Sequence, residues 1–224
     1  MQKLASINPG FCRRALEIFS QSFDRLIKNI TGSILICKLI SSAQFEDEYY
    51  FCLYVLKKNR EYLRKAYFNR MLVTLVGCCS DELLSHIVYY VRQQVWILMN
   101  DKFGNYLLQL LAERGQQEAK QMIKSACLKN ISTILTRKYP KFLLIKLIEM
   151  EKSSEFCDQL MGAIIRMDDA AIQNTIAKRD SAMLLVLIMS KQRSDLIEFS
   201  SDKLLYLLSS SQAKAYDYCK LFIN

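Results

Sequence analysis

A segment of twelve residues recurs along the chain at a spacing of 36 residues. "KFGNYLLQLLAE" at 102–113 aligns without a gap on "KYPKFLLIKLIE" at 138–149, and the two copies share a lysine, two aromatic positions, a leucine pair and a final glutamate. Weaker copies lie at 66–77 and 30–41, and a fifth lies at 178–189 after a four-residue insertion. Each repeat has room for two helices. Helix pairs at a fixed period stack into an α-solenoid, and we expect about five such repeats here.

Composition supports an all-α fold. Only 6 glycines and 2 prolines occur among 224 residues, which argues against a turn-rich all-β architecture. The chain is 51% hydrophobic and 24% charged, as globular proteins are. A non-repetitive helical bundle is the alternative, but four gapless matches at one spacing favour the solenoid. We therefore expect one repeat domain over 1–224, closed by a helical cap at 195–224.

The third repeat indicates where its two helices begin and end. An apolar-periodic segment from about Leu83 to Leu98 predicts the first helix, and the second is expected to begin near Lys102. A short break at Asn100–Asp101 precedes that second helix, and asparagine and aspartate are both good N-caps. Pro140 supports the same boundary in the next repeat, because proline is tolerated in the first turn of a helix and disrupts it later.

Several functional classes lack their signatures in this sequence. The N-terminus contains no apolar signal region, and the longest apolar runs are far shorter than the ~18 residues of a membrane span. Eight cysteines without a C-x-x-C pair and a single histidine, His86, predict neither a metal site nor a disulfide framework. No phosphate-binding glycine loop or H-E-x-x-H motif is present, so we expect no enzyme, no catalytic residue and no cofactor. The expected location is a reducing, intracellular compartment: the cytoplasm, or alternatively the nucleus or nucleolus.

Positive charge is concentrated in the first two thirds of the chain, whose net charge is +9. Residues 1–60 contain nine basic and five acidic side chains, and residues 61–150 contain thirteen and seven. Residues 151–224 contain nine and ten. This distribution fits a polyanionic partner, although it fits a solvated surface equally well.

The start of the second helix in the third repeat carries a motif. It reads D-x-[FY]-G-N-Y-x-x-Q and consists of Asp101, Phe103, Gly104, Asn105, Tyr106 and Gln109. This motif in a helix pair of this length resembles the Pumilio (PUF) repeat, and the resemblance covers roughly residues 20–190, mostly through spacing. It implies a right-handed, curved solenoid whose second helices line a concave face and bind single-stranded RNA, one base per repeat. That family typically has eight repeats, so the chain resembles a shortened and divergent member.

Two amides in this motif suit a base edge. Asn105 and Gln109 lie four residues apart, so they project from one helical face and offer donors and acceptors. The resemblance implies that this pair selects uracil. The equivalent pairs in the other repeats are Ser33 with Cys37, Asn69 with Val73, Lys141 with Ile145, and Ser181 with Leu185. Three of these pairs contain an aliphatic side chain that cannot hydrogen-bond, so we expect most sequence discrimination to be lost.

Stacking and phosphate contacts are expected beside these pairs. The residue after each first amide position could stack on bases, and the series is Ile34, Arg70, Tyr106, Phe142 and Ala182. Arg70, Tyr106 and Phe142 have the planar groups that stacking needs. The candidate phosphate-binding side chains are Lys102, Lys138, Lys141, Arg137, Arg64 and Lys65.

Two functions remain open at this point. The first is a single-stranded RNA-binding protein that regulates messenger RNA or takes part in ribosomal RNA processing and ribosome assembly, with weak sequence specificity. The second is a protein-interaction scaffold that keeps the solenoid and has lost RNA binding. A protein partner could supply further binding surface in either case, and we expect neither a membrane nor DNA as partner.

Overall fold

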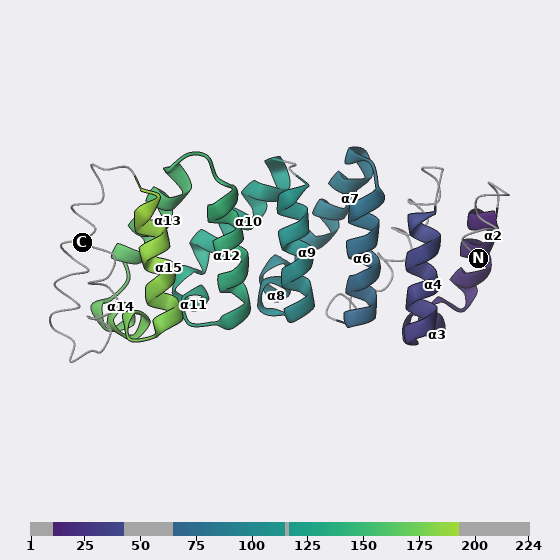
Figure 1. The fold of residues 1–224 in the computed structure, drawn as a ribbon, viewed down its shortest axis with the longest axis horizontal. Helices are drawn as coiled ribbons and strands as arrows, with labels where there is room; N and C mark the ends of the chain where they lie inside the picture. Colours follow the sequence, from purple (N-terminus) through teal and green to yellow (C-terminus); the bar gives the residue numbers. More distant parts are fainter. Residues whose placement is uncertain (1–10, 43–64, 115–116, 193–224) are drawn as a thin grey trace. The chain divides into compact units, whose positions relative to one another are not determined.

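The computed structural model describes residues 11–42, 65–114 and 117–192, and these residues form helices and connecting turns without any strand (Figure 1). In chain order the helices are α2 (Phe11–Gln21), α3 (Phe23–Ile27), α4 (Ile30–Ser41), α6 (Ala66–Cys78), α7 (Asp81–Arg92), α8 (Val95–Asn100), α9 (Lys102–Glu113), α10 (Gln117–Lys129), α11 (Ile131–Ile134), α12 (Lys138–Met150), α13 (Glu155–Ile165), α14 (Asp169–Ile176) and α15 (Arg179–Ser190). The all-α prediction is confirmed.

The helices that carry the sequence repeat begin 36 residues apart. Asn29, Lys65, Asp101 and Arg137 are the N-caps of α4, α6, α9 and α12. The Asp101 carboxylate accepts hydrogen bonds from the backbone N–H groups of Phe103 and Gly104, at 2.9 and 2.8 Å. The predicted helix start at Lys102 and its aspartate cap are therefore confirmed.

The prediction of two helices per repeat is wrong in one respect. The expected first helix of the third repeat is broken at Gln93 and Gln94 into α7 and the short α8. The same long–short–long order occurs in α2–α3–α4, α10–α11–α12 and α13–α14–α15. The break lets α8 turn back and pack on the beginning of α9.

A glycine permits this close packing. A Cβ atom on Gly104 would lie 2.7 Å from the Leu98 Cα atom, and one on Gly32 would lie 2.1 Å from the Leu26 carbonyl oxygen. Real Cβ atoms do not approach other atoms so closely. Glycine is therefore required where α8 meets α9 and where α3 meets α4.

The fifth repeat lies one residue further along the chain than the sequence alignment predicts. Helix α15 starts at Arg179, which is 41 residues after the start of α12 at Lys138, rather than the predicted 40. The pattern of buried and exposed side chains over 140–148 repeats over 181–189 except at the last position. Buried Leu184 and Leu185 thus take the places of buried Leu143 and Leu144. The insertion is five residues, because burial of the leucine pair fixes the register.

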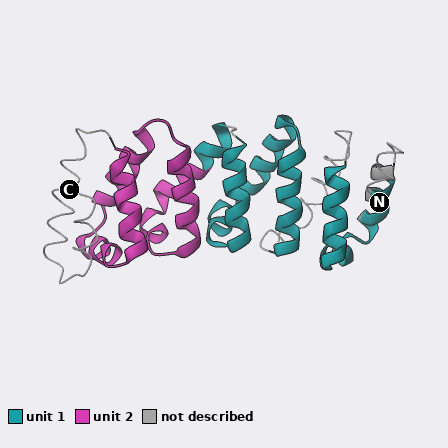
Figure 2. Ribbon diagram, viewed as in Figure 1, with its two compact units in different colours: residues 1–122 teal, residues 123–224 magenta. Residues whose placement is uncertain are grey.

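The chain divides into two compact units, residues 1–122 and 123–224 (Figure 2). In the first unit α4, α6 and α9 lie side by side (Figure 1), and their core includes fully buried Leu72, Leu107 and Leu111. In the second unit α15 packs against both α12 and α13, and the core includes buried Leu144 and Leu160. The extent of a single domain over 1–224 stays a prediction, and the expected cap at 195–224 lies outside the described residues.

Arg114 ties two repeats of the first unit together. Its guanidinium donates to the carbonyl oxygens of Cys79, at 2.7 Å, and Gly77, at 3.4 Å. These carbonyls belong to the C-terminal end of α6, where helical carbonyls lack partners within the helix. The end of α9 is thereby held to the end of α6, which keeps the two helices in register.

No helix in the described ranges is long and apolar enough to cross a membrane. Within the same ranges, no group of three or more His, Cys, Asp or Glu side chains is arranged to hold a metal ion.

Candidate nucleic-acid interface

The same three positions recur in α4, α6, α9 and α12 with the same exposure. The first position is buried in each helix and is occupied by Ser33, Asn69, Asn105 and Lys141. The next residue, the stacking position, is exposed and is occupied by Ile34, Arg70, Tyr106 and Phe142. The fifth position is half-buried and is occupied by Cys37, Val73, Gln109 and Ile145. The surface of these helices is therefore formed by stacking and fifth positions, and the first position lies beneath it.

The amide pair of the third repeat is joined by a hydrogen bond. The Gln109 Nε2 donates to the Asn105 Oδ1 at 2.7 Å, and the Asn105 Nδ2 donates to the Met99 carbonyl oxygen at 3.2 Å. Asn105 is only 3% exposed, whereas Gln109 is half-exposed. The structure thus brings the two predicted base-edge residues together, with Gln109 as the part that reaches the surface.

The equivalent asparagine of the second repeat is bonded differently. Asn69 is also 3% exposed, but its Nδ2 has no hydrogen-bond partner among the described residues. A buried amide group without a partner costs about 1–3 kcal/mol of stability. In the first repeat, the Ser33 hydroxyl donates to the Ile30 carbonyl oxygen at 2.9 Å. Burial raises the pKa of the Cys37 thiol, so this side chain stays protonated.

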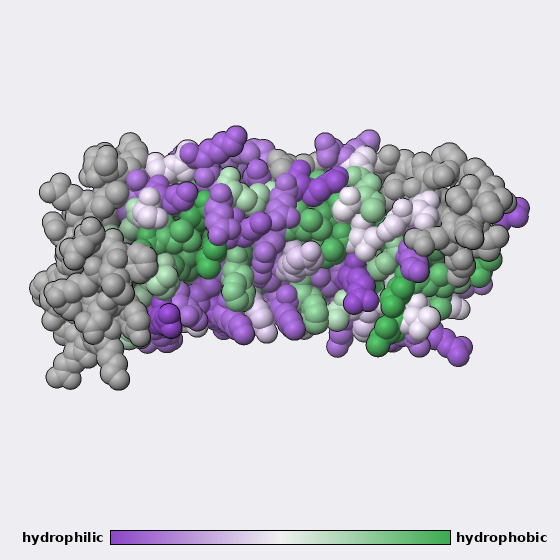
Figure 3. Space-filling view, viewed as in Figure 1, coloured by the Kyte–Doolittle hydropathy of each residue, from purple (hydrophilic) through white to green (hydrophobic). Residues whose placement is uncertain are grey.

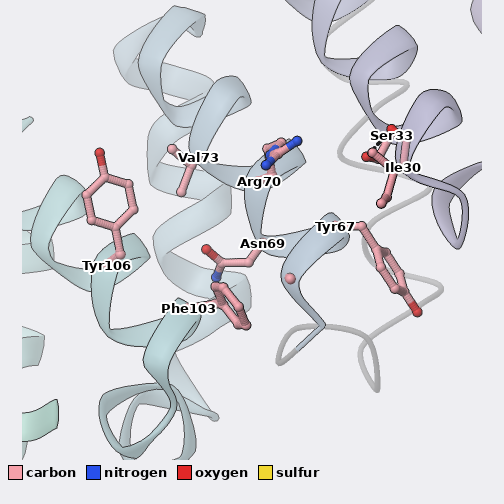
Figure 4. A pocket seen from close by; sticks show the side chains of 9 residues that line it. Ile30, Ser33, Tyr67, Asn69, Arg70, Val73, Phe103 and Tyr106 are labelled. Atoms are coloured by element: carbon pink, nitrogen blue, oxygen red, sulfur yellow. Dashed lines mark hydrogen bonds between the residues drawn. The ribbon is translucent and has the colours of Figure 1, made fainter.

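A pocket of about 460 Å³ lies over α4, α6 and α9. Its walls include Asn69, Arg70 and Val73 of α6 and Tyr106 of the neighbouring α9 (Figure 4). Figure 4 shows Val73 between the Arg70 guanidinium and the Tyr106 ring, and Phe103 beside Asn69. Tyr106 is 57% exposed, and Arg70 is exposed as well. Two planar groups therefore flank the apolar side chain of Val73.

Most of the predicted phosphate-binding side chains lie on the surface. Lys65 is exposed at the start of α6, Lys102 at the start of α9, and Arg137 and Lys138 at the start of α12. The Lys102 Nζ lies 5.6 Å from the centroid of the Phe103 ring. Arg64 lies outside the described residues. The cations recur at the N-terminal ends of the helices, where helix dipoles also favour anions.

Lys141 differs from its predicted role as an exposed phosphate-binding residue. It is 9% exposed, and its Nζ donates to the Ser181 hydroxyl at 3.0 Å, while that hydroxyl donates to the Leu135 carbonyl oxygen at 2.5 Å. Burial lowers the pKa of Lys141 from its ordinary value, nearby Asp180 raises it, and nearby Lys178 lowers it. The lysine fills the first position of its repeat and links α12 to α15, because its stem is long enough to reach the neighbouring helix.

The shifted register of α15 changes which residues of the fifth repeat reach the surface. Ala182 occupies the buried first position, Met183 the exposed stacking position and Val186 the half-buried fifth position. The predicted pair of Ser181 and Leu185 is buried. Sequence reasoning missed Met183 and Val186, and aligning the leucine pair at 184–185 on that at 143–144 would have found them.

Comparison with known proteins identifies the fold. No family model matches the chain, and no curated protein matches it. Among solved structures, PUF-8 in complex with PBE-RNA matches 97% of the chain, with a TM-score of 0.77 and 14% identity. A Puf4 variant bound to the Cox17 RNA 3′ UTR recognition sequence matches 92%, with a TM-score of 0.73 and 20% identity. The RNA-binding domain of yeast Puf5p bound to AAT2 RNA matches 88%, with a TM-score of 0.70 and 19% identity.

These matches confirm, at the level of the fold, the resemblance to Pumilio repeats that the sequence predicts. The chain is an α-solenoid of the kind seen in PUF-8, Puf4 and Puf5p. It spans 66%, 63% and 54% of the lengths of those three structures.

Proposed function

We propose that the protein binds single-stranded RNA through the pocket over α4, α6 and α9. The observation that carries the proposal is the pair of exposed planar groups, Arg70 and Tyr106, on neighbouring helices above this pocket. Stacking on such a group contributes about 1–3 kcal/mol per base and tolerates any base. The three structures of the same fold are complexes with RNA, which supports this ligand over others.

The proposed contacts divide into two classes. Arg70 and Tyr106 stack on bases, and the half-exposed Gln109 amide meets a base edge. Lys65 and Lys102, at the N-terminal ends of α6 and α9, pair with phosphates. Phosphate contacts position the strand without reading its sequence, and salt weakens them.

We infer weak sequence specificity, with one preference for uracil. Gln109 presents an amide to the surface, whereas Val73 and Ile145 at the same position of the neighbouring repeats have no polar atom. A single base contact discriminates by about 1–3 kcal/mol, so one such position favours one base without defining a long target.

Fluorescence anisotropy tests this function directly. Labelled uracil-rich, adenine-rich and base-paired RNAs are titrated with the purified protein over a series of salt concentrations. We expect salt-sensitive binding to both single strands, weaker binding to the duplex, and a loss of about tenfold for Tyr106→Ala.

Tyr89→Ala provides a matched control, because Tyr89 is 67% exposed on α7, away from the pocket. It should bind RNA like the unmodified protein. Equal losses for Tyr89→Ala and Tyr106→Ala, or no RNA binding at low salt, would reject the proposal.

The proposed role is regulation of messenger RNA or processing of ribosomal RNA, without enzymatic activity, in the cytoplasm or alternatively the nucleus. A scaffold that binds only proteins is the alternative function. The observation in its favour is the apolar surface of the second unit, where Phe142 is 50% exposed and Met183 is 44% exposed.

A further inference from the structure

The second unit presents only apolar side chains at the stacking and fifth positions, where α6 and α9 of the first unit also present the polar side chains of Arg70, Tyr106 and Gln109. Phe142 and Met183 occupy the stacking positions of α12 and α15, and Ile145 and Val186 occupy the fifth positions. We call these four residues the apolar face. The two helices are neighbours, since the Lys141 Nζ bonds to the Ser181 hydroxyl between them. The stacking and fifth positions of α12 and α15 are thus all occupied by apolar side chains.

No polar side chain at the first positions beneath this face is available to read a base. The Lys141 amine is committed to Ser181, and Ala182 has no polar side-chain atom. Ser181 is 0% exposed and donates to the Leu135 carbonyl oxygen. A base between α12 and α15 would meet the Phe142 ring on one side, but no second planar group at Met183 and no hydrogen-bonding edge. RNA recognition does not explain this arrangement.

Positive charge borders one end of the apolar face. Exposed Arg137 and Lys138 start α12, and exposed Lys178 and Arg179 start α15, while Asp180 is the one acidic residue among them. Figure 3 shows hydrophobic side chains (green) over α12 and α15, with hydrophilic ones (purple) towards the lower edge of the view. Apolar anchors beside a charged rim are the composition of a peptide-binding surface.

We propose that the apolar face binds a short peptide segment of a partner protein, in which large apolar side chains lie next to Asp or Glu. The peptide's apolar side chains bury Phe142 and Met183, and its carboxylates pair with Lys138 and Arg179 at the helix starts. This peptide site does not rest on RNA binding by the first unit. The second unit then recruits a protein, whatever the first unit binds.

Peptide selection on the full chain tests the proposal. A phage-displayed library of random peptides is selected on the immobilised protein. The peptides are about twelve residues long, which is enough to cross two helices. Enriched peptides are synthesised with a fluorescent label and titrated by anisotropy. We expect them to combine Leu, Ile or Phe with Asp or Glu.

Two lysine substitutions separate the apolar face from other exposed apolar residues. Met183→Lys should weaken peptide binding by about tenfold or more, because it places a charge at the centre of the face. Ile97→Lys is the matched control, since Ile97 is 46% exposed on α8 of the first unit, and it should change binding less than about twofold. Both side chains lie at the surface, so both variants should fold, which circular dichroism checks.

RNA binding by two alanine variants distinguishes the two ligands. Phe142→Ala should leave the affinity for uracil-rich RNA within about twofold of the unmodified value, while Tyr106→Ala lowers it. An equal loss for Phe142→Ala and Tyr106→Ala would assign the apolar face to RNA and overturn the proposal. A selection that enriches no peptide, or peptides that Met183→Lys binds unchanged, would overturn it as well. If the RNA proposal is wrong, Tyr106→Ala will not lower RNA affinity, and this result is independent of peptide binding.

Discussion

The Gln109 Nε2 donates a 2.7 Å hydrogen bond to the Asn105 Oδ1, and this bond orients the Gln109 amide. Asn105 is itself held by its bond to the Met99 carbonyl oxygen at 3.2 Å. Because the Nε2 is used in this bond, the Gln109 Oε1 is the atom that would accept the N3–H of uracil in the proposed complex. In that complex the buried asparagine would support the glutamine, and the glutamine would contact the base. Changing Asn105 would therefore disturb the helix packing as well as the binding surface.

Gln109→Leu isolates the proposed uracil contact. It removes the surface amide while leaving the Asn105 bond to Met99 in place. We expect the preference for uracil-rich over adenine-rich RNA to fall by about 1–3 kcal/mol, with stacking retained. Competition anisotropy with the two RNAs measures this preference, and Gln121→Leu on exposed α10 surface is the control. An unchanged preference in Gln109→Leu would show that the glutamine reads no base.

Gly104→Ala should destabilise the protein by about 1–3 kcal/mol, because its Cβ would lie 2.7 Å from the Leu98 backbone and force α8 away from α9. Gly77→Ala is the control, since a Cβ there meets nothing within 4 Å. Alanine is favoured over glycine in a helix, so this control should be neutral or stabilising by up to ~1 kcal/mol. Thermal unfolding followed by circular dichroism compares the two. Similar melting temperatures for both variants would contradict the close packing of α8 on α9.

Ser181→Ala should cost about 1–3 kcal/mol of stability, because it leaves the Lys141 amine and the Leu135 carbonyl buried without their partner. Lys141→Met should be far milder, since methionine fills the space and Ser181 still donates to Leu135. Urea unfolding measures both. If Lys141→Met were the more damaging of the two, Lys141 would contribute a contact other than the one to Ser181.

The cysteines should differ in reactivity according to their burial. Burial raises the pKa of Cys127 to about 12, and burial with the nearby Asp158 carboxylate raises the pKa of Cys157 to about 11. Both thiols remain protonated as the pH rises from 7 to 9, so iodoacetamide should leave them unmodified over that range until the protein unfolds. Among the cysteines whose side chains the structure describes, exposed Cys78 should react first, and buried Cys79 beside it serves as the internal comparison. Peptide mass spectrometry after timed alkylation reads out each site, and early modification of Cys127 would contradict its burial.

The repeat was predictable because its signals are local in the sequence. Asp101 caps α9 through its own side chain, and the alternation of apolar and polar residues in α9 defines its buried side. The exposure of Tyr106 and the proximity of Asn105 to Gln109 follow from helical geometry alone. The sequence therefore places these residues correctly within the repeat, and its motif at 101–109 predicts the likeness to Pumilio structures.

Contacts between helices could not be predicted from these local signals. The burial of Asn105 and Asn69 depends on the residues packed above the first turn of each helix. Lys141 is buried because its amine bonds to Ser181, which is 40 residues away in the sequence. The sequence alignment places the fifth repeat one residue too early, because it does not show that the leucine pair Leu184 and Leu185 must be buried in the core. The sequence by itself determined the helices, their period and the residues that begin them, since these depend on neighbours along the chain. The tertiary structure alone decided which polar groups form hydrogen bonds within the protein and which remain accessible to a ligand. Burial and hydrogen bonding across helices depend on how all the helices pack together.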